Sequence, residues 1–445
     1  MKTSMSAKLT KLGIGICAVV LAFMPFHAFL TVWASTFVGH YTLLRLWKEI
    51  LIVVVLPGVA YILYRNKRLW KEVKRAWLFR LFALYIGLHI LLGGVALMRN
   101  QVNGTALADG LILNLRLVVF FFVTWVCASS SPWLRKHARN LLLIPAIVVV
   151  VFGLLQAFVL PADFLSHFGY SSATIAAYQT VNHDMHYVRV QSTLRGSDPL
   201  GAYLIVIISI LATLLSGRRI RGKWQRKACI GLLVGSLIVL YFTYSRSAYI
   251  GTILALGVIG WCALKSRRAK RVLLLGGFCI CLIGGVSALA LRHNSRFEST
   301  FFHTDQQSLS PHSSNQNHAS ALESGIHDVI HQPLGRGPGT AGPASVHNIY
   351  PARIAEDYYL QIGQEVGWIG LFLFLAITAL VAWRLWERRE DWLALALLAS
   401  LVGISFVNLL SHAWADDTLS LIWWGMAGIA LAVTRVLPDK ATEKR

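Results

Sequence analysis

Long apolar runs constrain this chain more than any other feature of its sequence. A helix of about 20 apolar residues crosses a hydrocarbon core of roughly 30 Å, and many such runs follow one another here. With 56% hydrophobic and 14% charged residues, the 445-residue chain has too little polar side chain to cover a water-soluble fold. The runs also lack the two-residue alternation of a membrane β-barrel. The sequence therefore predicts an all-α, polytopic membrane bundle.

We expect about twelve transmembrane helices. Their approximate ranges are 12–34, 49–64, 77–97, 110–129, 141–160, 199–216, 228–244, 248–264, 272–291, 357–383, 393–411 and 418–436. The chain then divides into spans one to nine (1–291), a large outer loop between spans nine and ten (292–356), and spans ten to twelve with a tail (357–445).

Two outer loops stand out against the short connections elsewhere. The first is 161–198, and the second is the large loop. Within the large loop, apolar residues recur at helical spacing and predict a short amphipathic helix at about 318–331. Pro333 and the Gly-rich turn that follows should end this helix. Such a helix would lie on the membrane surface or cover a cavity.

The net charge of +22 is distributed in a way that indicates topology rather than nucleic-acid binding. Basic clusters stand at 65–75, 135–139, 217–227, 265–271 and 384–389. With twelve spans, these loops all fall on the same side as both termini. Because cytoplasmic loops carry an excess of Lys and Arg, we expect a multi-pass protein of the cytoplasmic (inner) membrane with both termini in the cytoplasm. No nucleic-acid partner is expected.

The sequence does not indicate a metal site or a nucleotide site. His183 and His186 flank Asp184, but no third ligand is placed by the sequence, so they are interpreted as polar loop residues. There is no P-loop and no GxGxxG that follows a strand, which argues against an ATP-driven pump.

Three arginines lie where the outer loops meet the membrane. Arg189 and Arg195 precede a helix that we expect Asp198 to cap, and Arg246 lies in a three-residue link between two spans. Arginines near helix ends often only reach toward lipid phosphates. Their forked donors also suit the phosphate oxygens of a bound substrate, and better than lysine does.

Two carboxylates, Glu356 and Asp357, open the tenth span at the same outer face. They could simply cap that helix, because carboxylates are favourable at a helix N-terminus. Gly367 and Gly370 further along are interpreted as close helix packing. A carboxylate beside phosphate-binding arginines could also take a proton from an acceptor hydroxyl. Cations and a base at the outer boundary suit transfer from a lipid-linked pyrophosphate.

Four segments resemble the O-antigen ligase and polymerase superfamily of multi-spanning bacterial glycosyltransferases. RVQSTLRGSDPLGAYL is similar to the Arg-containing approach to a helix that starts with proline, and SRS resembles the Ser-Arg pair of that superfamily. HQPLGRGPG resembles its His-Pro-Leu-Gly-x-Gly-x-Gly turn. Glu356-Asp357, nine residues and then Gly367-Trp-Ile-Gly370 reproduce a motif in which family ligases carry His at the first position.

The resemblance implies a helical membrane fold of the GT-C kind and a glycosyltransferase activity. Such an enzyme moves a glycan from an undecaprenyl-pyrophosphate donor to a hydroxyl of a glycan, lipid or protein acceptor on the outer face of the cytoplasmic membrane, for cell-surface polysaccharide assembly. It implies inversion at the anomeric carbon, no cofactor and no metal. Whether the chain is a ligase or a polymerase stays open.

The same resemblance, with the residue types, implies roles for particular side chains. Arg246 is the central one, and a carboxylate or a histidine would activate the acceptor. The implied residues are Arg189, Arg195, Arg246 and Arg353 for the pyrophosphate, Glu356 or His347 for the acceptor hydroxyl, and Asp357 on the acceptor side.

Two other functions remain open from the sequence. A transporter or flippase of a lipid-linked saccharide would need charges along a path through the bilayer, whereas the predicted spans hold few beyond Arg80 and Arg116. A structural membrane scaffold would make no single outer arginine essential.

Overall fold

The computed structural model describes residues 5–181, 184–217, 220, 222–272, 275–277 and 314–433. Its α-helices include α1 (Met5–Phe23), α2 (His27–Val38), α3 (Tyr41–Leu44), α4 (Trp47–Arg65), α5 (Lys67–Arg75), α6 (Trp77–Met98), α7 (Gly104–Ser130), α8 (Trp133–Phe158), α9 (Ser197–Ser216), α10 (Lys223–Phe242), α11 (Arg246–Ala263), α14 (Ser314–His331), α15 (Tyr358–Glu387), α16 (Trp392–Val407) and α17 (Asp417–Leu431). Short 3-10 turns are η1 (Met24–Phe26), η2 (Phe164–Phe168), η4 (Gly342–His347) and η5 (Ala413–Ala415), and the strands are β1 (Gln179–Val181) and β2 (Asp184–Arg189).

The predicted all-α membrane bundle is confirmed. Among the described residues, nine helical segments are long and apolar enough to cross a membrane, and α16 and α17 are shorter apolar helices. The first of the nine runs through α1, η1 and α2, where Pro25 introduces a 3-10 turn. Together these eleven elements coincide with eleven of the twelve expected spans. The remaining span, 272–291, and the first part of the large loop, up to residue 313, lie almost wholly outside the described residues.

The centre of the bundle is formed by helices that are apolar on every side. Every residue of α17 is buried, and α17 packs along α7. Most of α9 is buried as well, between α10, α11 and α16. Helix α10 instead exposes Ile230, Val234 and Leu237. A helix that is apolar all round belongs in the interior, whereas one with a long exposed apolar face suits contact with lipid.

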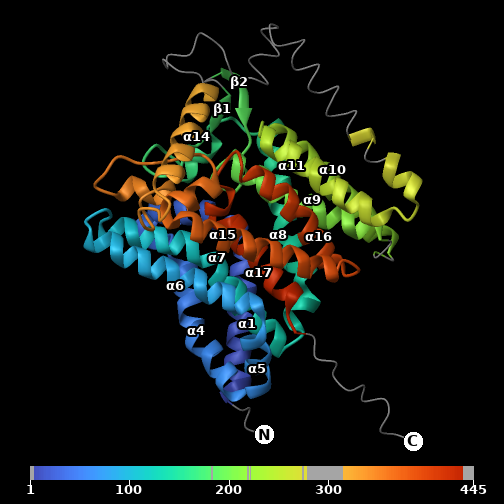
Figure 1. The fold of residues 1–445 in the computed structure, drawn as a ribbon. Coiled ribbons are helices and arrows are strands. Elements are labelled where there is room, and N and C mark those ends of the chain that lie inside the picture. The colour runs from blue at the N-terminus through green and yellow to red at the C-terminus, as the bar shows by residue number, and fades with distance from the viewer. Residues whose placement is uncertain are drawn as a thin grey trace, which may run out of the picture.

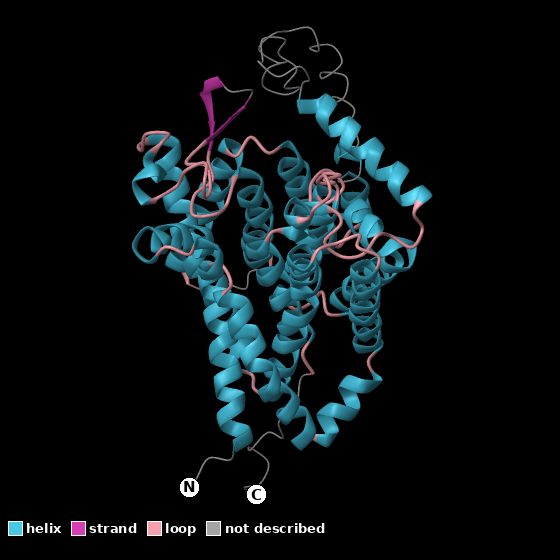
Figure 2. Cartoon of the chain, turned by 90° about the vertical axis from the view of Figure 1, so that its left-hand side faces the viewer, coloured by secondary structure: helices cyan, strands magenta, loops and turns pink. Residues whose placement is uncertain are grey.

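The hairpin and the basic helix α5 mark opposite ends of the bundle (Figure 1). Strands β1 and β2 pair antiparallel, with Gln179 opposite Arg189 and a register shift after Thr180. Figure 2 shows this hairpin projecting beyond the helices. The predicted amphipathic helix of the large loop is present as α14, at the same end of the molecule as the hairpin (Figure 1).

Helix α15 is broken at Gly367, where the backbone has φ 66° and ψ −169°. The break is filled by the glycine turn, residues 332–339, which follows α14. Trp368 N donates to the Pro333 carbonyl at 2.9 Å, and two amides of the glycine turn donate to carbonyls of α15 just before the break, at 2.7 and 3.0 Å. Backbone groups away from water need such partners. The Gly-x-x-Gly motif therefore begins at a helix break, which the sequence interpretation as helix packing had missed.

Candidate active site

The first wall of the site forms where β2 ends and α9 begins. Arg189 donates from Nε to the Thr243 carbonyl at 2.9 Å and from Nη2 to Asp198 Oδ1 at 2.8 Å. The prediction that Asp198 caps α9 is wrong, because the N-cap residue is Gly196 and the Asp198 carboxylate pairs with Arg189 instead. These two contacts hold the Arg189 guanidinium between the start of α9 and the α10–α11 link.

The α10–α11 link supplies the second cation. Tyr244 has φ 51°, a left-handed conformation that is uncommon outside glycine. Ser245 then adopts an extended conformation as the N-cap of α11, and its amide donates to Thr243 Oγ1 at 3.2 Å. Arg246 is consequently the first residue of α11, so the helix begins two residues before the predicted span and includes the arginine that the sequence had placed in the link.

The two carboxylates at the start of α15, Glu356 and Asp357, have different surroundings. Asp357 is the N-cap, and its Oδ1 accepts from the Leu360 amide at 2.8 Å. Burial raises the pKa of Asp357, against the effect of the amide hydrogen bonds. Glu356 has φ 55°, a left-handed backbone conformation. Two residues further along the chain, the Tyr358 amide donates to the Asn408 carbonyl at 3.0 Å. This contact ties the start of α15 to the end of α16.

These segments meet at one cavity of about 800 Å³, which we call the arginine cavity. Arg189, Arg195 and Arg246 line it together with Glu356, so residues from three separate segments converge on it. The full lining is Gln179, Arg189, Arg195, Gly196, Asp198, Pro199, Ala202, Tyr244, Ser245, Arg246, Ser247, Ala319, Leu322, Ala355, Glu356, Leu409, Leu410, Ser411, His412, Ala413 and Asp416. Helix α14 covers one side through Ala319 and Leu322.

Three residues implied by the resemblance do not line the arginine cavity as far as the structure describes it. Asp357 is the helix cap described above. His347 lies at the end of η4, about half exposed, with Nδ1 2.7 Å from Asp109 Oδ2. Arg353 binds Asp328 of α14, with 3.0 Å between Nε and Oδ2. Burial opposes ionisation of Asp328, but hydrogen bonds from Arg353 and Gln364 outweigh it and lower its pKa.

The cavity also contains two residues that sequence reasoning missed, Asp416 and His412. Asp416 caps α17 by accepting from the Leu419 amide at 3.0 Å, and its Oδ2 lies 3.7 Å from an Arg195 guanidinium nitrogen. Burial alone would lower the pKa of Arg195, but the charges of Asp416 and its neighbour Asp417 outweigh it and raise that pKa. Arg195 therefore stays fully cationic. The overlooked signal was a second carboxylate pair directly before an apolar helix.

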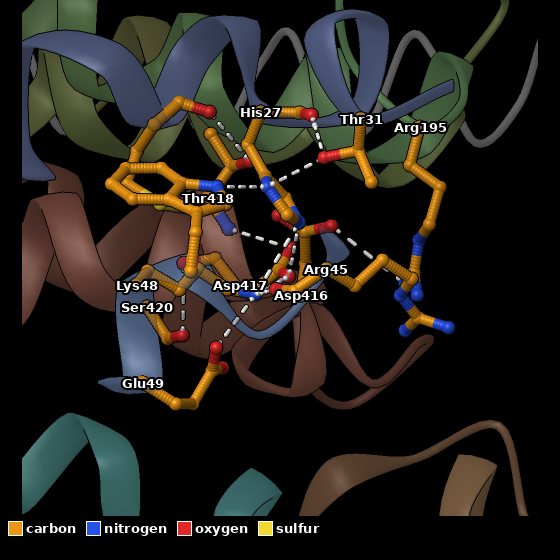
Figure 3. A network of polar contacts seen from close by, with 12 residues as sticks. His27, Thr31, Arg45, Lys48, Glu49, Arg195, Asp416, Asp417, Thr418 and Ser420 are labelled. Atoms are coloured by element: carbon orange, nitrogen blue, oxygen red, sulfur yellow. Dashed lines mark hydrogen bonds and ion pairs between the residues drawn. The ribbon is translucent and has the colours of Figure 1, made fainter. Parts of the chain in front are cut away.

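Behind Asp416, a buried ion network reaches into the bundle (Figure 3). Asp417 Oδ2 lies 3.1 Å from His27 Nε2 and 3.0 Å from Lys48 Nζ. Lys48 also lies 3.1 Å from Glu49 Oε2, and Glu49 Oε1 is 3.9 Å from Arg116. From Asp417 inwards, anions and cations thus alternate through Lys48 and Glu49 to Arg116 on α7, which holds the start of α17 in place. Arg116, an isolated charge in the sequence, is the inner end of this network.

The cavity is suited to binding a polyanion next to a proton acceptor. Three guanidinium groups that line one space can each donate to phosphate oxygens, and their charge favours a leaving group that gains negative charge. Glu356 supplies a carboxylate in the same space. Within the described residues, no group of three or more His, Cys, Asp or Glu side chains could hold a metal ion.

The model of the O-antigen ligase family matches residues 230–375 of this chain. The matched region begins in α10, contains Arg246, the glycine turn and Glu356, and ends within α15. This match supports the O-antigen ligase and polymerase superfamily that the motifs resemble. No curated protein sequence matches the chain.

Proposed function

We propose that this member of the O-antigen ligase and polymerase superfamily transfers a glycan from an undecaprenyl-pyrophosphate donor to an acceptor hydroxyl. The reaction would take place at the outer face of the cytoplasmic membrane, with both chain termini in the cytoplasm. The observation that carries the proposal is the arginine cavity, where Arg189, Arg195, Arg246 and Glu356 lie together.

In the proposed reaction the arginines bind and stabilise the pyrophosphate. Arg189 and Arg246 hold its oxygens, and Arg195 assists from the side of α17. The bond between the anomeric carbon and the phosphate oxygen breaks as the acceptor oxygen bonds to that carbon. The electron pair of the broken bond stays on undecaprenyl pyrophosphate, whose added charge the guanidinium groups stabilise. A single displacement of this kind inverts the anomeric carbon, and it needs no metal.

Glu356 is the proposed base, and it takes the proton of the acceptor hydroxyl as the new bond forms. A positioned general base contributes about 10²–10⁴ in rate. His347 was the alternative base on sequence grounds, but its contact with Asp109 outside the arginine cavity favours Glu356. For the same reason Arg353, bound to Asp328, is proposed to hold α14 over the cavity rather than to bind pyrophosphate.

The test is a transfer assay in proteoliposomes with an undecaprenyl-pyrophosphate glycan and a panel of acceptors. We expect Arg246→Ala to lower the transfer rate by at least about 10²-fold, since removing one donor to a developing charge costs that much. Arg246→Lys should recover only part of this, because a lysine lacks the planar fork. Glu356→Gln should lose about 10²-fold or more. Normal transfer by a well-folded Arg246→Ala protein would overturn the proposal.

The same experiment separates this function from transport of a lipid-linked saccharide. A transporter would move the lipid without forming a product, and Glu356→Gln would leave that movement intact. If wild type transfers and Glu356→Gln transfers equally well, the base lies elsewhere. His412 is then the next residue to replace, because it also lines the arginine cavity.

A further inference from the structure

A second, smaller cavity adjoins the arginine cavity. Its volume is about 150 Å³, or roughly five water volumes at ~30 Å³ each, which is the scale of one sugar ring. We call it the tyrosine cavity; it lies between the ends of α8 and α10 and the hairpin. Its lining is Gln156, Ala157, Pro161, Ala162, Ala177, Tyr178, His186, Val188, Arg189, Val190, Gln191, Phe242 and Tyr244.

Arg189 and Tyr244 belong to both cavities, so they form the partition between them. A phosphate bound to Arg189 in the arginine cavity therefore has the tyrosine cavity directly beside it. Tyr244 is held by ring contacts with Tyr187 and Tyr241, each with centroids 6.0 Å apart. The partition therefore consists of the Arg189 guanidinium, held by two hydrogen bonds, and the Tyr244 ring, held by two neighbouring tyrosines.

The chemistry of the lining matches a carbohydrate better than a hydrocarbon chain. Tyr178 and Tyr244 supply aromatic rings with polar tips, and rings of this kind pack against the apolar face of a sugar while the tips bind hydroxyls. Gln156 and Gln191 add side-chain amides. Gln191 is 1% exposed; its Nε2 donates to the Ala176 and Ala177 carbonyls at 3.0 Å, and its Oε1 accepts no hydrogen bond from the described residues. A lipid tail here would leave such groups without partners.

We infer that the tyrosine cavity binds one sugar ring of the donor glycan, the ring attached to the pyrophosphate. The inference rests on the proposed function, since the phosphate at Arg189 fixes where that sugar begins. The rings of Tyr178 and Tyr244 hold the sugar, and the amides with Arg189 bind its hydroxyls. This subsite would select the first sugar of the donor and leave the rest of the glycan toward the hairpin.

Direct lipid binding tests the inference with two ligands on the full-length protein in nanodiscs. One ligand is an undecaprenyl-pyrophosphate glycan, and the other is undecaprenyl pyrophosphate without sugar. Ala162→Trp fills the tyrosine cavity with a bulky side chain, and Ala173→Trp is its matched control on the exposed loop outside the cavity. Tyr178→Ala is the second test variant, on a side chain that is 40% exposed and therefore tolerant of replacement.

We expect Ala162→Trp to raise the Kd of the glycan lipid about tenfold and to change the Kd of the sugar-free lipid less than twofold. Tyr178→Ala should act in the same direction by about fivefold, and Ala173→Trp should change neither. If Ala162→Trp unfolds the protein, Tyr178→Ala decides alone. Equal binding of the glycan lipid by the variants and wild type, or equal loss of both lipids, would overturn the inference. So would a rise in the acceptor KM alone, because the sugar would then belong to the acceptor.

Failure of the proposed function gives a different result. In that case wild type itself binds neither lipid and forms no transfer product. A wild type that binds and transfers, combined with variants that do not discriminate between the two lipids, removes only the subsite.

Discussion

Gly367 offers the sharpest test of how the large loop is connected to the first turns of α15, next to the arginine cavity. A Cβ atom at this position would lie 2.2 Å from the Pro333 carbonyl oxygen and 2.5 Å from the Leu334 carbonyl carbon. Real Cβ atoms essentially never approach other heavy atoms closer than 3.0 Å, and both neighbours here are backbone. Gly367→Ala must therefore push the glycine turn away from the break in α15.

The free-energy cost has two parts. The φ 66°, ψ −169° conformation is essentially restricted to glycine, and an alanine there costs about 1–3 kcal/mol. Displacing the turn also weakens the hydrogen bonds that fill the helix break, at about 1 kcal/mol each for two of them. The sum is about 3–5 kcal/mol of unfolding free energy. At ~2 °C per kcal/mol, the melting temperature should fall by about 6–10 °C.

Gly257→Ala is the matched control, because the same substitution in α11 meets no atom within 4 Å. Alanine in a helix interior is favoured over glycine by about 0.5–1 kcal/mol, so this variant should unfold at the same or a higher temperature. The assay is thermal unfolding of the purified protein in detergent, followed by transfer activity at a temperature where both variants are folded. Equal melting temperatures for the two variants would refute the account of the break.

Three further predictions concern the surroundings of the cavity. Asp417→Asn should destabilise the protein by about 3 kcal/mol in thermal unfolding, because it removes a buried counter-charge of Lys48; an unchanged melting temperature would contradict the network. Because contacts with Arg353 lower the pKa of Asp328, their stabilisation is complete above the ordinary carboxyl range near ~4 and is lost as pH falls through the lowered pKa. Hydrogen exchange of the α14 amides should therefore accelerate only as the pH falls through this lowered pKa. In the Asp328→Asn variant, the same amides should exchange fast already at neutral pH. His347→Gln should keep the transfer rate within about threefold of wild type, and a larger loss would return this histidine to the catalytic candidates.

The spans were predictable because the bilayer imposes one length scale on every crossing segment. Helices α4 and α6 to α11 follow from apolar runs of about 20 residues, without knowledge of their neighbours. The hairpin was not predictable in this way, since β1 has only three residues, too few to show an alternating pattern. The expected Asp198 cap failed for a tertiary reason: Arg189, at the end of β2, binds that carboxylate.

The sequence predicted at which depth in the membrane the candidate residues lie, but not which of them lie side by side. Arg246 and Glu356 lie at the ends of spans and Arg189 lies in the loop that leads to α9, so the predicted topology alone confines them to one layer. His347 and Arg353 lie in the large loop just before Glu356, yet they bind Asp109 and Asp328 instead of lining the cavity. Position within the layer depends on how the helices pack side by side, and this packing leaves little trace in a single sequence.

Residue pairs of like charge nevertheless hold information that goes beyond helix capping. In AEDYYL and ADDTLS, two adjacent carboxylates precede an apolar helix, and one of each pair is the observed cap: Asp357 for α15 and Asp416 for α17. A cap explains one carboxylate only. A second one at the edge of the hydrocarbon is costly unless a cation or a substrate proton stabilises it. For Asp417 the cation is Lys48, whose Nζ lies 3.0 Å from Oδ2, and His27 Nε2 lies 3.1 Å from the same oxygen. Glu356 is the second carboxylate of its pair, since Asp357 already caps α15, and it lines the arginine cavity, where we propose that it meets the proton of the acceptor hydroxyl.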